Sequence, residues 1–544
     1  YRDKALLLAR GLPLVEFFRS LLATGPSHSA GRQMSAHYSA RELNVASMVG
    51  PVGNNALHAV GNAQAVKFHP DSPVVICCVG DGTTQQGEFL EAVGEAVRTG
   101  APVVFVIQNN NWAISTKTPG QTFFDLPTGP ADSFLGLPIR RVDGVDLAAT
   151  RTAFESAVTH TRATRGPSLL LMELERLSDH TNADDQALYR AADELKSGKS
   201  RDPLEAIRQS LRESQMGDQA LAQLETSLIA EVAAAVVEAR GEAVPQTAGE
   251  AKAPYPAEFA HAKEYRGDAK APSLTMREAL NRVLRDQLQA NRDVHLLGQD
   301  IEDPKGDVFG VTKGLSTAFP GRVRNAPLSE STIVGTSIGR ALTGQRPVAF
   351  IQFADFLPLG FNQIISELGS MYWRTDGTWQ APVILMVSCG GYKAGLGPFH
   401  AQTLESILAH VPGIDVVMPS SAGDAAGLLN AAFQSKRPTV FLYPKSGLNL
   451  SDRRTSDDTA RQFVAPGKAR TVRQGNDLTL VTWGNPLTQS LLAAETLSGA
   501  GAEIDLIDLR SISPWDEDAV LRSVRRTKRL LVVHEDNHTA GFGA

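Results

Sequence analysis

The sequence is poor in cysteine, with three in 544 residues. Cys77 and Cys78 are neighbours in one apolar run, and Cys389 lies far from both. A disulfide framework needs paired cysteines at suitable spacings, so this number and placement argue against one. We interpret all three as small core residues.

Long apolar runs and an excess of basic residues are also missing. No window approaches 18 uninterrupted apolar residues, and the opening "YRDKALLLAR" lacks the features of a secretory signal. The formal net charge is −6, which does not favour binding to nucleic acid or to an anionic membrane. We therefore expect a soluble, cytoplasmic protein without a nucleic-acid or membrane partner.

The chain is too long for a single hydrophobic core and divides into several regions. Apolar runs alternate with helical stretches, which predicts parallel strands joined by helical crossovers and buried on both faces. We predict an α/β protein with two doubly wound parallel-sheet domains, at 1–244 and 273–465, and a smaller α/β domain at 466–544. A segment at 245–272, rich in Ala, Pro and Lys, reads as a linker. The ends of the sequence suggest a fragment trimmed at both termini.

Two strand ends in the first region carry polar groups. "PVVICCVGDGTTQQGEF" places Asp81 directly after an apolar strand, and "PVVFVIQNNNWAIST" places Asn110 after the next one. Ligands of parallel sheets bind beyond the carboxyl ends of the strands, and glycines such as Gly80 and Gly82 let phosphate approach the backbone. Hard oxygen ligands beside a phosphate suit Mg²⁺. Each segment alone is equally consistent with an ordinary turn, but the pair at this spacing favours a phosphate and metal site.

These two segments together resemble the diphosphate and metal motif of thiamine diphosphate enzymes. More specifically, they are similar to the alpha subunit of the first component of the 2-oxo acid dehydrogenase complexes, with further similarity in "GRQMSAHYS" and "HTNADDQALYR". Later segments, including "PLSESTIVG", "QFADF" and "FHAQTLESILAHVPG", resemble the beta subunit. The resemblance covers nearly the whole chain and implies a natural fusion of alpha and beta parts, with the thiamine diphosphate-binding fold and a transketolase C-terminal-like third domain, here incomplete.

The resemblance implies a set of cofactor-binding residues in the first domain. Mg²⁺ would be bound by the side chains of Asp81 and Asn110 and by the backbone carbonyl of Trp112. The cofactor would contact these residues together with Tyr1, Arg2, Gly80, Gly82 and Thr83.

The resemblance also implies catalytic residues. Glu330 occupies the position of the acid that contacts the distant pyrimidine nitrogen of thiamine diphosphate, and Phe356 that of the aromatic residue packed on the pyrimidine ring. His400 and His180 match catalytic histidines of the family, and a histidine can transfer a proton near neutral pH. Taken alone, Glu330 also fits a helix start, Phe356 a core position and each histidine a solvated loop.

Two positions depart from the family pattern. Gln299 stands where a Glu is usual, and Gln108 stands where branched-chain members have Arg. These replacements change the charges expected near the cofactor and leave the type of reaction unaffected.

The resemblance implies oxidative decarboxylation of a branched-chain 2-oxo acid, with reductive acylation of a lipoyl group on a partner dihydrolipoyl acyltransferase. It also implies a homodimer that replaces a two-plus-two tetramer, with each cofactor at a domain interface. Pyruvate or acetoin dehydrogenase activity of the same family remains an alternative, as does an enzyme of the transketolase or deoxyxylulose phosphate synthase type. A protein that binds the cofactor without catalysis is a further possibility.

Overall fold

The computed structural model describes residues 3–245, 259 and 262–544, and the chain forms two compact units. The first consists of Tyr1–Ala251 with the short segment Arg374–Trp379, and the second of Lys252–Trp373 with Gln380–Ala544. Tyr1 and Arg2 lie outside the described residues, as do 246–258, 260 and 261 of the predicted linker. Tyr265, near the end of that linker, forms a β-bridge with Phe463 of the second unit.

The first unit is built on a five-stranded sheet in the order β1-β2-β9-β8-β7, parallel except for β7. Its strands are β1 (Val75–Gly80), β2 (Val103–Asn109), β9 (Ser168–Glu173), β8 (Leu137–Asp143) and β7 (Ser133–Phe134). The short pairs β3 (Trp112–Ala113) with β4 (Thr116–Lys117) and β5 (Asp125–Leu126) with β6 (Gly129–Pro130) form two small hairpins. The helices are α1 (Lys4–Ala9), α2 (Leu14–Leu22), α3 (Asn54–Val66), α4 (Gly87–Thr99), α5 (Leu147–Thr164), α6 (Ala192–Lys199), α7 (Pro203–Glu213) and α8 (Asp218–Gly241).

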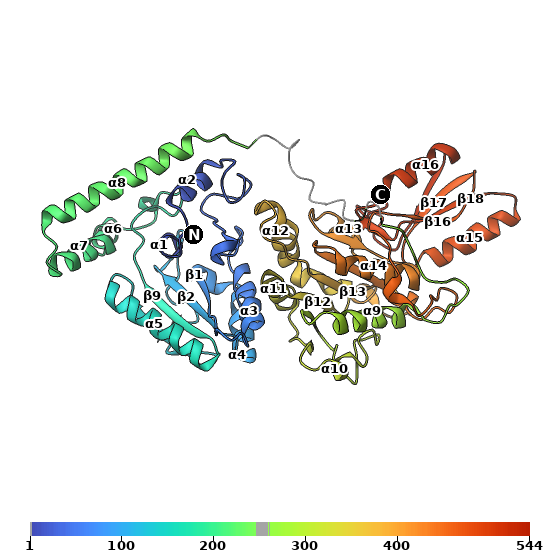
Figure 1. The fold of residues 1–544 in the computed structure, drawn as a ribbon, viewed down its shortest axis with the longest axis horizontal. Helices are drawn as coiled ribbons and strands as arrows, with labels where there is room; N and C mark the ends of the chain where they lie inside the picture. Colours follow the sequence, from blue (N-terminus) through green and yellow to red (C-terminus); the bar gives the residue numbers. More distant parts are fainter. Residues whose placement is uncertain (1–2, 246–258, 260–261) are drawn as a thin grey trace. The chain divides into compact units, whose positions relative to one another are not determined.

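Helices cover both faces of this sheet, as the continuous apolar runs predict (Figure 1). In β2, Phe105 and Ile107 pack in the core formed with α3 and α4, whereas Val104 and Val106 belong to the core formed with α5. A strand with two apolar faces has no room for a polar side chain along its length. In β2 the polar residues Gln108 and Asn109 therefore stand at the carboxyl end.

Helix α8 is largely exposed. Of its residues only Leu221, Ala235 and Ala239 are buried, and it packs mainly against α2. Among the helices of the described residues, α8 alone is long and apolar enough to cross a membrane, and one such helix is weak evidence for a membrane span.

The second unit contains a seven-stranded sheet in the order β11-β10-β12-β13-β15-β14-β19, parallel except for β19. Its strands are β10 (Val294–Gly298), β11 (Val323–Asn325), β12 (Arg346–Ile351), β13 (Ile384–Cys389), β14 (Asp415–Val417), β15 (Thr439–Pro444) and β19 (Ser511–Ser513). The helices are α9 (Met276–Ala290), α10 (Leu315–Ala318), α11 (Glu330–Leu342), α12 (Gly369–Arg374), α13 (Glu405–Ala409) and α14 (Ala422–Gln434).

Every residue of β12, β13 and β15 is buried, so this sheet too is enclosed on both faces. Val348 and Met386 lie in the core with α9 and α14, while their neighbours along the strands, such as Ala349 and Leu385, are also buried. Two 3₁₀ turns continue from these strands, η5 (Ala354–Gly360) after β12 and η8 (Lys445–Gly447) after β15.

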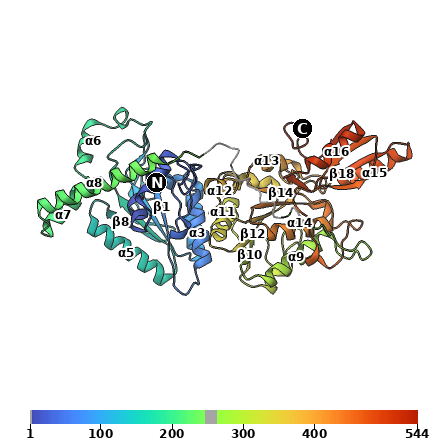
Figure 2. The same ribbon diagram turned by 45° about the horizontal axis from the view of Figure 1, so that its top comes forward.

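A four-stranded sheet completes the second unit, in the order β16-β18-β17-β20 (Figure 2). Its strands are β16 (Arg470–Arg473), β17 (Leu478–Thr482), β18 (Ile504–Asp508) and β20 (Leu530–Val533), with helices α15 (Leu487–Gly499) and α16 (Glu517–Thr527). Leu480 packs in the core with α15, whereas the neighbouring Thr479 hydrogen-bonds Ser523 of α16. The two helices therefore cover opposite faces, and the α/β fold expected from the sequence is confirmed.

Candidate active site

Asp81 follows β1 at the carboxyl edge of the first sheet. Gly80 is paired in register with Gln108 of β2, so the ends of the two strands lie side by side. Asp81 is 1% exposed, and its Oδ2 accepts a hydrogen bond of 2.6 Å from the hydroxyl of Thr118. The hydroxyl of Thr84 donates to the backbone carbonyl of Asp81 at 2.6 Å. Both the side chain and the backbone of Asp81 are thus held at this edge.

Asn110 lies just beyond β2, 4% exposed, in a turn that its own side chain supports. Its Oδ1 accepts from the backbone N–H of Trp112 at 3.1 Å. The turn leads into the β3–β4 hairpin, and the N–H of Thr118 donates to the carbonyl of Asn111 at 3.1 Å. The hairpin therefore carries Thr118 to Asp81. Nothing in the local sequence around Thr118 predicted this contact, because it depends on how the hairpin folds back.

The indole ring of Trp112 is fixed by four side-chain contacts. Nε1 donates to Glu194 at 2.9 Å, and the ring lies 5.1 Å from the Lys117 ammonium and 5.7 Å from the Arg190 guanidinium. The ring of Tyr189 packs 5.5 Å away. These contacts suit an indole, so the ring of Trp112 is well accommodated at this position.

The two glycines that flank Asp81 differ in the space available for a side chain. A Cβ on Gly80 would meet no atom within 4 Å, which leaves open space next to the backbone at this strand end. A Cβ on Gly82 would lie 2.6 Å from that of Ala113, so Gly82 is needed for the hairpin to pack. Thr83 is buried in the same 3₁₀ turn, η2 (Gly82–Gln85). Open space beside a backbone turn is compatible with a phosphate group.

The donor atoms at this edge match the needs of Mg²⁺ in kind. Among the residues that the structure describes, no group of three or more His, Cys, Asp or Glu side chains is arranged to hold a metal. A cation here would therefore draw on the carboxylate of Asp81, the amide oxygen of Asn110, a backbone carbonyl and the oxygens of a ligand. Mg²⁺ is typically bound through one or two protein oxygens and substrate phosphates.

His180 lies on the loop after β9, and a hydrogen-bonded chain connects this loop with the Trp112 turn. Its backbone N–H donates to Asp184 Oδ2 at 2.8 Å, and the hydroxyl of Tyr189 donates to the same oxygen at 2.7 Å. These two bonds, with that of Tyr189 the stronger cause, lower the pKa of Asp184. Tyr189 in turn packs on Trp112. The predicted histidine is thus linked to a predicted metal ligand within the first unit.

In the second unit, Glu330 is the first residue of α11 and is 8% exposed. Ser329 caps the helix by accepting from the N–H of Thr332, so Glu330 lies at a helix start, as its local sequence also allowed. The side-chain amide of Gln299, from the end of β10, donates to Glu330 Oε1 at 3.2 Å. Gln299 thus contacts the predicted catalytic acid directly.

His400 and Phe356 come together, although 43 residues separate them along the chain. Their ring centroids are 5.6 Å apart, and the ring of Phe353 lies 4.7 Å from that of His400 in an edge-to-face arrangement. Phe353 and Phe356 both follow β12, while His400 lies on the loop after β13. Neighbouring strands of the sheet therefore bring the predicted aromatic residue and the predicted histidine to one edge.

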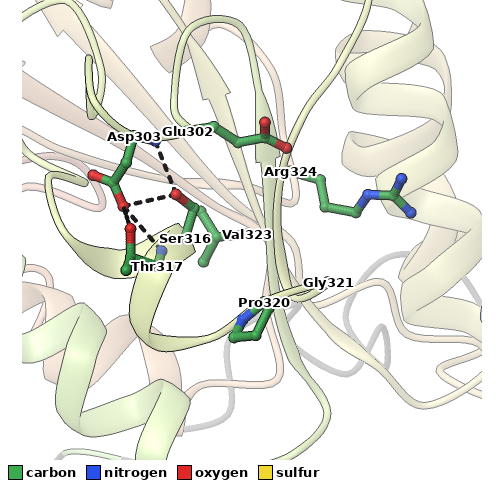
Figure 3. A pocket seen from close by; sticks show the side chains of 8 residues that line it. All are labelled: Glu302, Asp303, Ser316, Thr317, Pro320, Gly321, Val323 and Arg324. Atoms are coloured by element: carbon green, nitrogen blue, oxygen red, sulfur yellow. Dashed lines mark hydrogen bonds between the residues drawn. The ribbon is translucent and has the colours of Figure 1, made fainter.

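The second unit also carries a surface pocket of about 570 Å³ (Figure 3). It is lined by Glu302, Asp303, Ser316, Thr317, Pro320, Gly321, Val323 and Arg324. The carboxylate of Asp303 accepts from the hydroxyls of Ser316 and Thr317 and from backbone N–H groups, so it closes a loop. None of the predicted site residues lines this pocket.

Comparisons with known proteins assign each region of the chain to a family model. Residues 1–248 match the family model described as the dehydrogenase E1 component, 272–450 the transketolase pyrimidine-binding domain, and 467–544 the transketolase C-terminal domain. Transketolase from Leishmania mexicana aligns with 98% of this chain and 80% of its own at a TM-score of 0.61 and 17% identity, which is a similarity of fold alone.

Three curated relatives are beta subunits. The 2-oxoisovalerate dehydrogenase subunit of Bacillus subtilis is 37% identical over 48% of this chain and 78% of its own length. The 3-methyl-2-oxobutanoate dehydrogenase subunit of Mycobacterium tuberculosis is 38% identical over 50% and 77%. The pyruvate dehydrogenase E1 subunit of Staphylococcus epidermidis is 38% identical over 50% and 82%.

The parallel sheets, the pyrimidine-binding domain and the transketolase-like neighbour define a thiamine diphosphate-binding α/β protein. The chain belongs to the E1 component family of the thiamine diphosphate-dependent 2-oxo acid dehydrogenases, with an alpha-type part followed by a beta-type part.

The contact between Gln299 and Glu330 predicts a pH-dependent effect on stability. Gln299→Glu would place a second carboxyl beside Glu330 and raise the pKa of one of the two above the ordinary value of about 4.3. A carboxyl whose pKa is higher in the folded than in the unfolded protein lowers the free energy of unfolding as the pH rises towards that higher pKa. The melting temperature of the variant should therefore fall further below that of the wild type as the pH rises from 5 to 8.

Gln299→Met is the matched control for this measurement. It removes the same hydrogen bond without adding a charge, so its loss of melting temperature should change less over the same pH range than that of Gln299→Glu. Equal and pH-independent losses for both variants would contradict the contact.

Proposed function

We propose that this protein catalyses the oxidative decarboxylation of a branched-chain 2-oxo acid and transfers the acyl group to a lipoyl group on a partner dihydrolipoyl acyltransferase. Two groups of side chains at strand ends support this proposal most. In the first unit, Asp81 and Asn110 follow the adjacent ends of β1 and β2. In the second unit, the rings of Phe356 and His400 lie together. The names of two relatives, from Bacillus subtilis and Mycobacterium tuberculosis, favour a branched-chain substrate.

The proposal assigns the diphosphate and Mg²⁺ to the first unit. Asp81, Asn110 and the carbonyl of Trp112 would bind the metal, and the backbone around Gly80 and Gly82, with Thr83, would face the phosphate oxygens. Tyr1 and Arg2, which the resemblance adds to this set, lie outside the described residues. When bound, the cofactor supplies an electron sink for the pair left behind as CO₂ departs.

The second unit supplies proton-transferring groups in this proposal. Glu330 would hold a proton between its carboxylate and the pyrimidine of the cofactor, and Phe356 would pack against that ring. His400, and His180 of the first unit, would deliver or accept protons at the substrate and at the incoming lipoyl group. Gln299 would keep the carboxylate of Glu330 oriented by its amide hydrogen bond.

We further propose that the protein acts as a cytoplasmic homodimer, the fused equivalent of a two-plus-two tetramer, with the domain boundaries predicted from the sequence. Pyruvate is the second candidate substrate, because the relative from Staphylococcus epidermidis is a pyruvate dehydrogenase subunit of similar identity. The two substrates differ in the size of the acyl group, so direct comparison of turnover separates them.

Decarboxylation assays on the full chain test the function. 2-Oxoisovalerate, pyruvate and 2-oxobutyrate should each be supplied with an artificial electron acceptor, with and without thiamine diphosphate and Mg²⁺. We expect cofactor-dependent turnover with the highest kcat/KM for 2-oxoisovalerate. A preference for pyruvate would replace the branched-chain assignment, and cofactor-dependent turnover of none of the three would refute the proposal.

Glu330→Gln tests the proposed acid without a change in shape. Loss of a positioned proton-transferring group should lower kcat by at least about 100-fold while circular dichroism stays unchanged. Glu302→Gln, which removes a carboxylate from the pocket of Figure 3, is the control and should retain wild-type turnover. Wild-type kcat in Glu330→Gln would remove this residue from the mechanism.

Asp81→Asn tests the proposed metal site. Replacing a charged oxygen ligand by a neutral amide should raise the Mg²⁺ concentration required for half-maximal thiamine diphosphate binding, measured by calorimetry, by about tenfold or more. Asp71→Asn, at a carboxylate that is 88% exposed in the same unit, serves as the control and should leave that concentration unchanged. Identical Mg²⁺ dependence in the two variants would argue that the metal binds elsewhere.

A further inference from the structure

The peptide bond that follows His400 is held from both of its polar ends. The Nζ of Lys445 donates to the carbonyl of His400 at 2.6 Å. On the other side, Oδ1 of Asp355 accepts from the N–H of Ala401 and from that of Gln402, each at 3.3 Å. Because the carbonyl of His400 and the N–H of Ala401 belong to one planar unit, the two side chains together determine its orientation.

The same lysine reaches the imidazole of His400 through an aromatic ring. Its ammonium lies 4.8 Å from the ring centroid of Phe353 and 5.6 Å from that of Tyr392, within range of cation–π attraction. Phe353 in turn packs edge-to-face on His400. Lys445 therefore contacts the backbone of His400 directly and its side chain through one intermediate.

Burying the charged side chain of Lys445 costs free energy of folding, so its position needs a structural or functional reason. The residue is 5% exposed and begins the turn η8 directly after β15. Burial lowers the pKa of its ammonium, which the nearby carboxylates of Asp355 and Glu535 partly offset. Burial also raises the pKa of the neighbouring Cys389 thiol well above its ordinary value, which keeps that thiol neutral. Lysine is rarely buried unless its charge has partners.

We infer that Lys445 and Asp355 are positioning residues that clamp the His400–Ala401 peptide and thereby fix the imidazole of His400 for proton transfer. This inference rests on the proposed function, in which His400 acts on the substrate. Neither residue needs to touch substrate or cofactor. Both act through His400. A displacement of a reacting group by 1 Å can lower the reaction rate by up to about 100-fold.

Lys445→Met keeps the methylene stem and removes the charge and the hydrogen bond. In the full chain we expect kcat for the preferred 2-oxo acid to fall about 10- to 100-fold with little change in KM. In a His400→Ala background the same substitution should cost no further kcat, because the clamp then has nothing to position. Lys393→Met is the matched control, since Lys393 lies 5.4 Å from the other aromatic ring, that of Tyr392, and should leave kcat unchanged.

Hydrogen–deuterium exchange gives a readout that does not require turnover. The peptide covering residues 395–404 should exchange about tenfold faster in Lys445→Met than in the wild type, and Asp355→Ala should have the same effect from the other side. If Lys445→Met fails to fold, Asp355→Ala carries both the exchange measurement and the comparison with His400→Ala.

The outcomes separate this inference from the proposed function. Faster exchange in a protein whose wild type lacks cofactor-dependent turnover would refute the proposed function and leave the clamp intact. An active wild type with unchanged kcat or unchanged exchange in the variants would overturn the inference. Equal losses of kcat with and without His400 would also overturn it, because the effect would then be structural.

Discussion

The enclosure of parallel strands on both faces is the constraint on which the rest of this protein depends. In β2 consecutive side chains enter two different cores, and in β12, β13 and β15 every residue is buried. A polar group inside such a strand would lose its hydration without a partner. Ligand-binding groups are therefore expected in the turns beyond the carboxyl ends of the strands, which is where both units carry predicted site residues.

The two units use this edge differently. In the first, a small hairpin folds back so that Thr118 bonds Asp81, and a loop joins His180 to the ring on Trp112 through Asp184 and Tyr189. In the second, the turns after β12, β13 and β15 meet around His400. The predicted metal ligands thus lie in the alpha-type part, and the predicted histidine His400 lies among aromatic rings in the beta-type part.

Much of this arrangement could be predicted from the sequence because it depends on local patterns. Continuous apolar runs are typical of strands buried on both sides, and the glycines around Asp81 indicated a strand-end turn. The family motifs then predicted Glu330, His400 and Phe356. Thr118 and Lys445 could not be predicted in this way, because their partners lie 37 and 45 residues away and the contacts arise only when separate turns pack together. From the sequence, Gly82 was explained by the approach of phosphate to the backbone. In the structure its closest constraint is the side chain of Ala113, which leaves no room for a Cβ at this position.

The central claim is that the ends of β1 and β2 form the metal and diphosphate site of the family. Anomalous diffraction from crystals of the full chain grown with Mn²⁺, as a substitute for Mg²⁺, and thiamine diphosphate measures this directly. The account predicts an anomalous peak within about 2.5 Å of Asp81 Oδ and Asn110 Oδ1. Ordered cofactor with the peak elsewhere, or with no peak beside these two residues, would contradict it.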